Sequence, residues 1–86
     1  MRNRPMTVTV RRPSYGVVDI SIEHDVAASY SRAVDPRATR EARRVLRGTW
    51  RLTDVEYGLD TDVDGNDIRP NGRCRSRFTY ISEETR

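Results

Sequence analysis

Cys74 and His24 are the only cysteine and the only histidine in this chain of 86 residues. No disulfide can therefore form within one copy, and one copy cannot assemble a zinc site from Cys and His side chains. A domain this short buries a limited share of its surface, and only 35% of its residues are hydrophobic. The sequence therefore predicts a small core, which would gain stability from a macromolecular partner or from a second copy in a homodimer.

Apolar and polar residues alternate in four segments, which predicts strands over residues 6–10, 18–23, 49–59 and 73–81. Turn-forming residues at 11–16 and a polar connection at 60–72 join these strands into two antiparallel hairpins. A change of parity near Thr53 and Asp54 indicates a bulge. The aromatic residues placed on strands, which we expect in the core, are Trp50, Tyr57, Phe78 and Tyr80. His24 is expected at the surface or at a strand end.

Residues 36–47 carry the clearest helical pattern. Asp35 suits the N-cap, Pro36 suits the first helical position, and Gly48 suits the residue that follows a helix. On a helical wheel the apolar face holds Ala38, Ala42, Val45 and Leu46. The opposite face holds Arg37, Arg40, Arg43, Arg44 and Arg47, with Glu41 at the border within reach of Arg37 and Arg44.

The segment 25–34 fits two interpretations: a second short helix capped by Asp25, or an extended stretch. With either one, the sequence predicts a small α+β domain of two layers over residues 1–86, with frayed ends at 1–5 and 82–86. An antiparallel sheet of about four strands would be packed by the amphipathic helix Pro36–Arg47. Neither a targeting signal nor a run of membrane-spanning length is evident, so we expect a cytoplasmic protein without membrane contact.

All sixteen basic residues of the chain are Arg, and the net charge is +3. We favour codon usage in a GC-rich genome over selection for guanidinium chemistry as the explanation of this bias. If the Arg clusters are functional, their planar forks would follow a phosphate backbone. The predicted nucleic-acid-binding residues are Arg40, Arg44 and Arg47 on the helix, and Arg73, Arg75 and Arg77 on the last strand. Arg75 and Arg77 could instead pair across strands with Asp54 or Glu56.

The segment from Asp54 to Asp67 contains six acidic residues and no basic one, next to the Arg-rich segment 37–51. Such a two-signed surface would steer the protein onto a charged partner, with the acidic run imitating a row of phosphates, unless the two segments neutralise each other. The turn residue Tyr15 is expected to be exposed and to anchor a partner. The predicted partner-binding residues are Tyr15, Asp60, Asp62, Asp64 and Asp67.

The string Asp60-Thr61-Asp62-Val63-Asp64-Gly65 resembles the opening of an EF-hand calcium loop. Asn71 stands at the twelfth position, where a bidentate Glu is expected, and strands rather than helices flank the string. We therefore favour a solvated hairpin tip over a calcium site and assign no metal ligand. Asp62 and Asp64 are also the only candidates for paired catalytic carboxylates, and a mobile loop supports catalysis poorly.

We expect from these features a non-enzymatic protein, without a cofactor, that docks on a larger macromolecule, most simply a protein partner. By analogy with small proteins of GC-rich bacteria and their phages, it would be a mobile-element accessory protein that inhibits a host defence complex, as anti-CRISPR proteins do. The alternatives are a small Arg-rich nucleic-acid-binding protein and a minor calcium-binding hairpin loop. The identity of the partner and the oligomeric state stay open.

Overall fold

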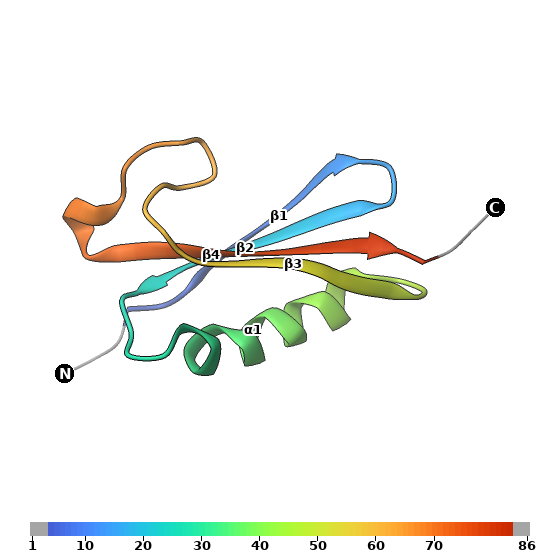
Figure 1. Cartoon of the computed structure of the whole chain (residues 1–86), viewed down its shortest axis with the longest axis horizontal. Coiled ribbons are helices and arrows are strands. Elements are labelled where there is room, and N and C mark those ends of the chain that lie inside the picture. Colours follow the sequence, from blue (N-terminus) through green and yellow to red (C-terminus); the bar gives the residue numbers. More distant parts are fainter. Residues whose placement is uncertain (1–3, 84–86) are drawn as a thin grey trace.

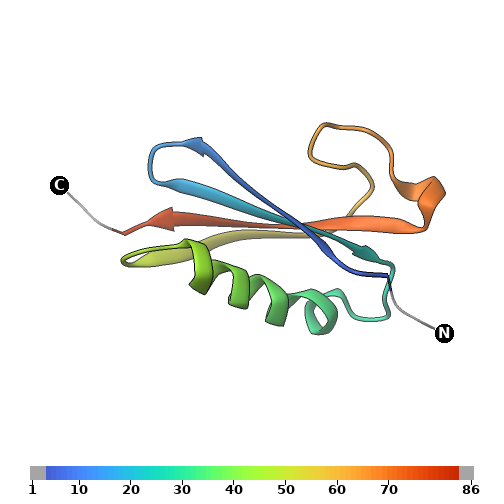
Figure 2. The ribbon, with the colours of Figure 1, turned by 180° about the vertical axis from the view of Figure 1, so that it is seen from behind.

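The computed structural model describes residues 4–83, which form one antiparallel sheet and one α-helix (Figure 1). The elements are β1 (Thr7–Ser14), β2 (Val17–Asp25), α1 (Tyr30–Val45), β3 (Trp50–Leu59), the 3-10 turn η1 (Arg69–Asn71) and β4 (Arg73–Ser82). The strand order is β1-β2-β4-β3. The helix lies along one face of the sheet, and the connection between β3 and β4 lies on the other (Figures 1 and 2). This architecture confirms the predicted small α+β domain.

The first hairpin is longer than the sequence predicted. β1 continues through the expected turn to Ser14, and only Tyr15 and Gly16 form the turn, with Gly16 at a φ of 78°. The pairing with β2 shifts register between Arg11 and Ser14, where Pro13 lies. A proline fits here because β1 is an edge strand and needs no outward hydrogen bond from this position.

The second hairpin joins β3 to β4, with a register shift between Leu52 and Asp54. This shift confirms the predicted bulge. The alternation within each strand did not indicate that β4 also pairs along its length with β2, from Val17 with Ile81 to Asp25 with Arg73. That pairing places β2 and β4 in the centre of the sheet.

The helical region differs most from the expectation. Instead of the expected helix Pro36–Arg47, one helix runs from Tyr30 to Val45, with Leu46 rather than Arg47 at its C-terminal end. Ser29 is the N-cap, and its hydroxyl oxygen accepts a hydrogen bond from the backbone N–H of Arg32. Pro36 lies inside this helix, where a proline costs about 3 kcal/mol. Burial of apolar side chains on both sides of Pro36 offsets that cost. The assignments of Asp35 and Asp25 as N-caps are therefore wrong, and no second α-helix occurs within residues 4–83.

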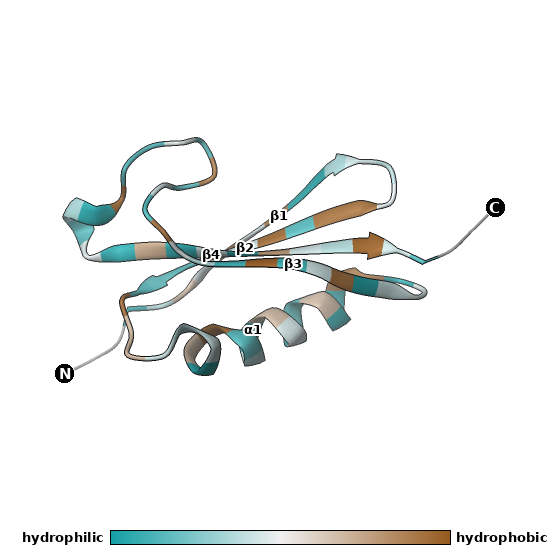
Figure 3. Cartoon of the chain, viewed as in Figure 1, coloured by the Kyte–Doolittle hydropathy of each residue, from teal (hydrophilic) through white to brown (hydrophobic). Residues whose placement is uncertain are grey.

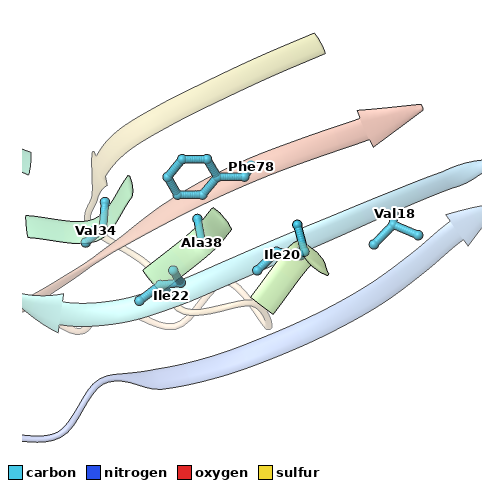
Figure 4. Close-up of a cluster of buried hydrophobic side chains, with 7 residues drawn as sticks. Val18, Ile20, Ile22, Val34, Ala38 and Phe78 are labelled. Carbon is cyan, nitrogen blue, oxygen red and sulfur yellow. The ribbon is translucent and has the colours of Figure 1, made fainter. Parts of the chain in front are cut away.

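The core lies between α1 and the two central strands (Figure 4). Its buried side chains are Val18, Ile20 and Ile22 of β2, Val34, Ala38 and Ala42 of α1, and Phe78 of β4. The predicted apolar helix face is confirmed, since Ala38 and Ala42 are buried and Val45 and Leu46 pack against the core. The placement of Tyr57 in the core is wrong: its side chain is 39% exposed.

Of the segments within residues 4–83, none forms a helix with the length and apolar character needed to cross a membrane. The predicted fraying of residues 1–3 and 84–86 falls outside the described residues. Next to them, Pro5 accepts a hydrogen bond from Arg73 through its carbonyl oxygen, and the backbone N–H of Glu83 donates to the carbonyl oxygen of Thr49.

Candidate functional site

The sheet separates the six predicted nucleic-acid-binding arginines into two groups. Arg40 and Arg44 lie on α1, and Arg47 follows its C-terminus. Arg73, Arg75 and Arg77 belong to β4, where the alternate residue Phe78 faces the helix, so these three arginines face the opposite side. The structure therefore does not bring the six residues together, because the two groups lie on opposite sides of the sheet.

The outer face of α1 presents the exposed guanidinium groups of Arg32, Arg40 and Arg43, and the exposed Arg47 lies two residues beyond the end of the helix. At 100° per residue, the three helical positions fall within one side of the wheel, opposite the buried side chains, and together with Arg47 they form a stripe. Among residues 4–83, none of the four side chains forms an ion pair or a hydrogen bond. Figure 3 shows hydrophilic residues recurring along this helix. We call this surface the arginine stripe.

Two residues of the stripe were not among the predicted site residues. Arg32 was missed because the expected helix began at Pro36; only a wheel drawn from Ser29 onward places it beside Arg43. Arg44, which was predicted, differs from the others because it donates two hydrogen bonds to Glu41 Oε1, at 3.1 and 2.8 Å.

Glu41 is the buried acid at the border of the helix face, as the wheel indicated. Its carboxylate accepts hydrogen bonds from Arg44 and from Arg37 Nε at 3.0 Å, and the residue is 7% exposed. The two guanidinium groups lower the pKa of Glu41, and Arg44 has the larger effect. These contacts hold Arg37 and Arg44 on the helix surface and compensate their charge. The positive charge of the arginine stripe has no such compensation among the described residues.

Arg73 has a structural role. Its side chain is 10% exposed and its guanidinium donates to the carbonyl oxygens of Pro5 and Glu23, at 2.9 and 3.0 Å, and to Asp25. Three of the five N–H donors of this guanidinium have protein acceptors, and its small exposed surface leaves little access for a phosphate backbone. This geometry does not favour the predicted contact of Arg73 with nucleic acid.

The acidic residues expected to bind a partner make contacts within the chain. Asp60 and Asp67 flank Arg69, at 3.6 and 3.1 Å, and Asp64 forms an ion pair with Arg11 of β1 at 3.2 Å. Local neutralisation, which was the alternative interpretation of the charge asymmetry, therefore applies to these three carboxylates. The loop presents no free row of negative charge at these positions.

The half-buried Asp62 stabilises the loop through hydrogen bonds from the loop's backbone. Its Oδ1 accepts hydrogen bonds from the backbone N–H groups of Asp64 and Asn66, both at 2.9 Å. These two bonds lower the pKa of Asp62, and the bond from Asn66 has the larger effect. Within residues 4–83 no three His, Cys, Asp or Glu side chains cluster as a metal site would require. The resemblance to a calcium loop thus corresponds here to an Asp-centred turn.

A cavity of about 460 Å³ lies between the β3–β4 loop and the open face of the sheet. Its lining residues are Arg11, Arg12, Pro13, Asp19, Ser21, Val63, Arg75 and Arg77. Arg77 pairs with Glu56 across strands, as one sequence alternative held, but its Nε–H is buried and has no acceptor. Arg75 donates to the carbonyl oxygen of Thr61 at 2.7 Å and has no ion pair among the described residues. The pKa of Arg75 is lowered, mainly by burial of its side chain and to a smaller extent by the positive charge of Arg77.

Tyr15 is fully exposed, as the sequence predicted, and borders a groove of about 720 Å³. The groove also contains Trp50, Ile81, Arg12 and Arg47 among its lining residues. Arg47 therefore belongs both to this groove and to the arginine stripe, and it makes the two surfaces continuous.

The only Cys and the only His of the chain meet in the interior, which sequence spacing did not reveal. The expected surface position of His24 is wrong, because its side chain is 2% exposed, near the end of β2. Its Nδ1 donates to the carbonyl oxygen of Asp25 at 2.9 Å, and its Nε2 lies 2.8 Å from the Ser76 hydroxyl. Cys74 Sγ lies 3.6 Å from His24 Nδ1.

This pair lacks the features of a catalytic Cys–His dyad. Cys74 is 3% exposed, and burial raises the pKa of its thiol, whereas a nucleophilic cysteine needs access and a lowered pKa. The cluster therefore packs the end of the core as a satisfied polar group.

The comparisons with known proteins give no match: no protein-family model, no curated protein and no solved structure is similar to this chain.

Proposed function

We propose that this protein is a non-enzymatic binding protein that holds single-stranded nucleic acid on the arginine stripe and the adjoining Tyr15 groove. The observation that supports this most is the absence of partners for the stripe. Most carboxylates of the described residues engage a local Arg, hydroxyl or backbone N–H, whereas Arg32, Arg40, Arg43 and Arg47 engage none.

The stripe has the length to follow a backbone. Between Arg32 and Arg43 the helix rises about 16 Å, which corresponds to several phosphates of one strand. Each guanidinium that contacts a phosphate releases counterions, so binding of this kind becomes weaker as salt increases. Four such contacts would give a slope of log affinity against log salt of about −3 for a single strand.

The groove supplies what the helix face lacks, namely aromatic surface. Single-stranded nucleic acids bind where a positive track lies beside aromatic rings on which bases stack. Tyr15 is fully exposed at the groove, and Arg12 and Arg47 line the same groove. A strand that follows the stripe toward Arg47 would therefore place a base against the Tyr15 ring.

The test is a salt series of binding to a fluorescent single-stranded oligonucleotide. Replacing Arg40 and Arg43 with Gln should weaken binding and reduce the salt slope by about half, because two of four contacts are lost. The matched control replaces Arg51 and Arg69, which removes the same charge from arginines paired with carboxylates. Equal losses in the two double variants would contradict the proposal.

A second pair of variants tests stacking. Tyr15→Ala should weaken oligonucleotide binding by about tenfold, whereas Tyr15→Phe keeps the ring and should bind like the wild type. If Ala and Phe behave alike, the ring does not stack on a base.

A protein partner is the second candidate, favoured by the exposed Tyr15 beside Ile81 in the same groove. Tyr and Arg are enriched among residues that dominate protein interfaces, and Arg12 and Arg47 would suit an acidic partner. The expected cytoplasmic setting, with a phage protein inhibiting a host defence complex, fits either candidate. Co-purification at low salt with and without nuclease separates them: a protein that stays bound after nuclease and is lost in Tyr15→Ala supports the second candidate.

A further inference from the structure

The cavity beneath the β3–β4 loop lies on the face of the sheet opposite the arginine stripe, and of its lining residues only Arg12 also lines the Tyr15 groove. Two observations distinguish it from ordinary surface. Four of its lining residues are Arg and one is Asp, and carboxylates outside the lining pair with only two of the four arginines, Arg11 and Arg77. The loop closes over it from two sides, through Arg75 to the Thr61 carbonyl oxygen and through Asp64 to Arg11.

The charge of Arg75 and Arg77 is only partly compensated. They are alternate residues of β4, so their side chains share one face of the sheet. Arg77 Nη2 pairs with Glu56, but its buried Nε–H has no acceptor. Arg75 Nη1 lies 3.3 Å from the Ser21 hydroxyl, and no described carboxylate forms an ion pair with it. Two half-buried guanidinium groups side by side repel each other, and an anion between them would relieve that repulsion.

We propose that this cavity binds a small phosphate monoester whose organic part carries hydroxyl groups, such as a sugar phosphate. The phosphate would accept hydrogen bonds from Arg75 and Arg77 within the cavity and from Arg12 at its rim. Arg12 is exposed and its side chain has no partner among the described residues.

The Asp19 carboxylate is the reason for proposing a ligand with hydroxyl groups. Asp19 lines the same cavity and accepts a 2.8 Å hydrogen bond from the Thr79 hydroxyl. Its remaining lone pairs would repel a bare phosphate and accept a hydrogen bond from a sugar hydroxyl. The volume of about 460 Å³ exceeds what one phosphate fills and lies within the range of small-molecule sites.

The experiment is a calorimetric titration of the full chain with ribose 5-phosphate, inorganic phosphate and ribose at constant ionic strength. Saturable binding is expected for ribose 5-phosphate, weaker binding for inorganic phosphate and none for ribose. Arg75→Gln should weaken the binding of ribose 5-phosphate on the order of tenfold, whereas Arg69→Gln, which removes a loop arginine outside the cavity lining, should not change it.

Two further variants keep the test decisive. If Arg75→Gln does not fold, the exposed Arg12→Gln takes its place with the same expectation. Asp19→Asn should strengthen the binding of inorganic phosphate relative to that of ribose 5-phosphate, because the substitution removes the repulsion between the Asp19 carboxylate and the phosphate. Binding that is not saturable, or that is equally strong in Arg12→Gln, Arg75→Gln and Arg69→Gln, overturns the proposal. Because Arg40→Gln should leave sugar phosphate binding unchanged, failure here is distinguishable from failure at the arginine stripe.

Discussion

The Tyr57 hydroxyl donates a 2.7 Å hydrogen bond to Oδ1 of Asp35. This bond joins β3 to the middle of α1, and it explains what the Asp before Pro36 does in a helix that begins six residues earlier than expected. The carboxylate stabilises the protonated phenol and raises the pKa of Tyr57 to about 12.

Tyr57→Phe should lower the free energy of unfolding by about 0.5 kcal/mol at neutral pH, the low end for a hydrogen bond because the side chain is 39% exposed. The folded-state pKa is raised, so this contribution is complete below the ordinary tyrosine pKa of about 10 and disappears as the pH rises toward 12. Urea unfolding from pH 8 upward measures it. The fully exposed Tyr15→Phe is the control and should change nothing; equal effects of the two variants would contradict the assignment.

Glu41→Gln should lower the free energy of unfolding by about 1–2 kcal/mol at pH 7, because the three hydrogen bonds from the two guanidinium groups lose their charged acceptor. The folded-state pKa of Glu41 is lowered, so its stabilisation is present above the ordinary Glu pKa and is lost as the pH falls through the folded-state value. The difference from wild type should therefore shrink in acid. Glu83→Gln, at an exposed pair with Arg51, is the control. A difference that persists unchanged in acid would be evidence against this account.

Gly58→Ala should destabilise the protein more than Gly65→Ala. Both glycines have positive φ, 70° and 90°, so each substitution carries a backbone cost of roughly 1 kcal/mol. A Cβ at Gly58 would in addition lie 3.2 Å from Cε2 of the Tyr30 ring, whereas nothing lies within 4 Å of one at Gly65. Thermal unfolding of the two variants measures the difference, and equal shifts would show that the Tyr30 ring gives way freely.

The Cys74 thiol should react slowly with a water-soluble thiol reagent at neutral pH, since it is 3% exposed and its pKa is raised. Denaturant should increase the rate in proportion to the unfolded fraction. A Ser31→Cys variant supplies an exposed thiol on the helix as the reference and should react at once with one equivalent. Rapid reaction of Cys74 in the folded wild type would show that the end of the core opens without unfolding.

The strands were predictable because their information is local. Val18, Ile20 and Ile22 alternate with polar residues, and one face of a half-buried strand requires that spacing. The bulge beside Thr53 and the pairing of Glu41 with two arginines were also predictable from spacing alone. The start of α1 was not, because local signals favoured Asp35 as a cap, and only the burial of Val34 against the sheet shows why the helix continues through Pro36.

The sequence by itself determined the elements and the chemistry they carry: a sheet and a helix, an excess of guanidinium groups, and no means of forming a disulfide in one copy. The tertiary structure decided which charges remain free. The pairing of β2 with β4 and the return of the loop over the sheet join residues far apart in the chain, such as Arg11 with Asp64 and Arg77 with Glu56. Compensation of charge depends on distances of a few ångströms between side chains, and those distances exist only once the strands have paired. The folded chain therefore pairs three carboxylates of the acidic loop with arginines and leaves the arginine stripe exposed.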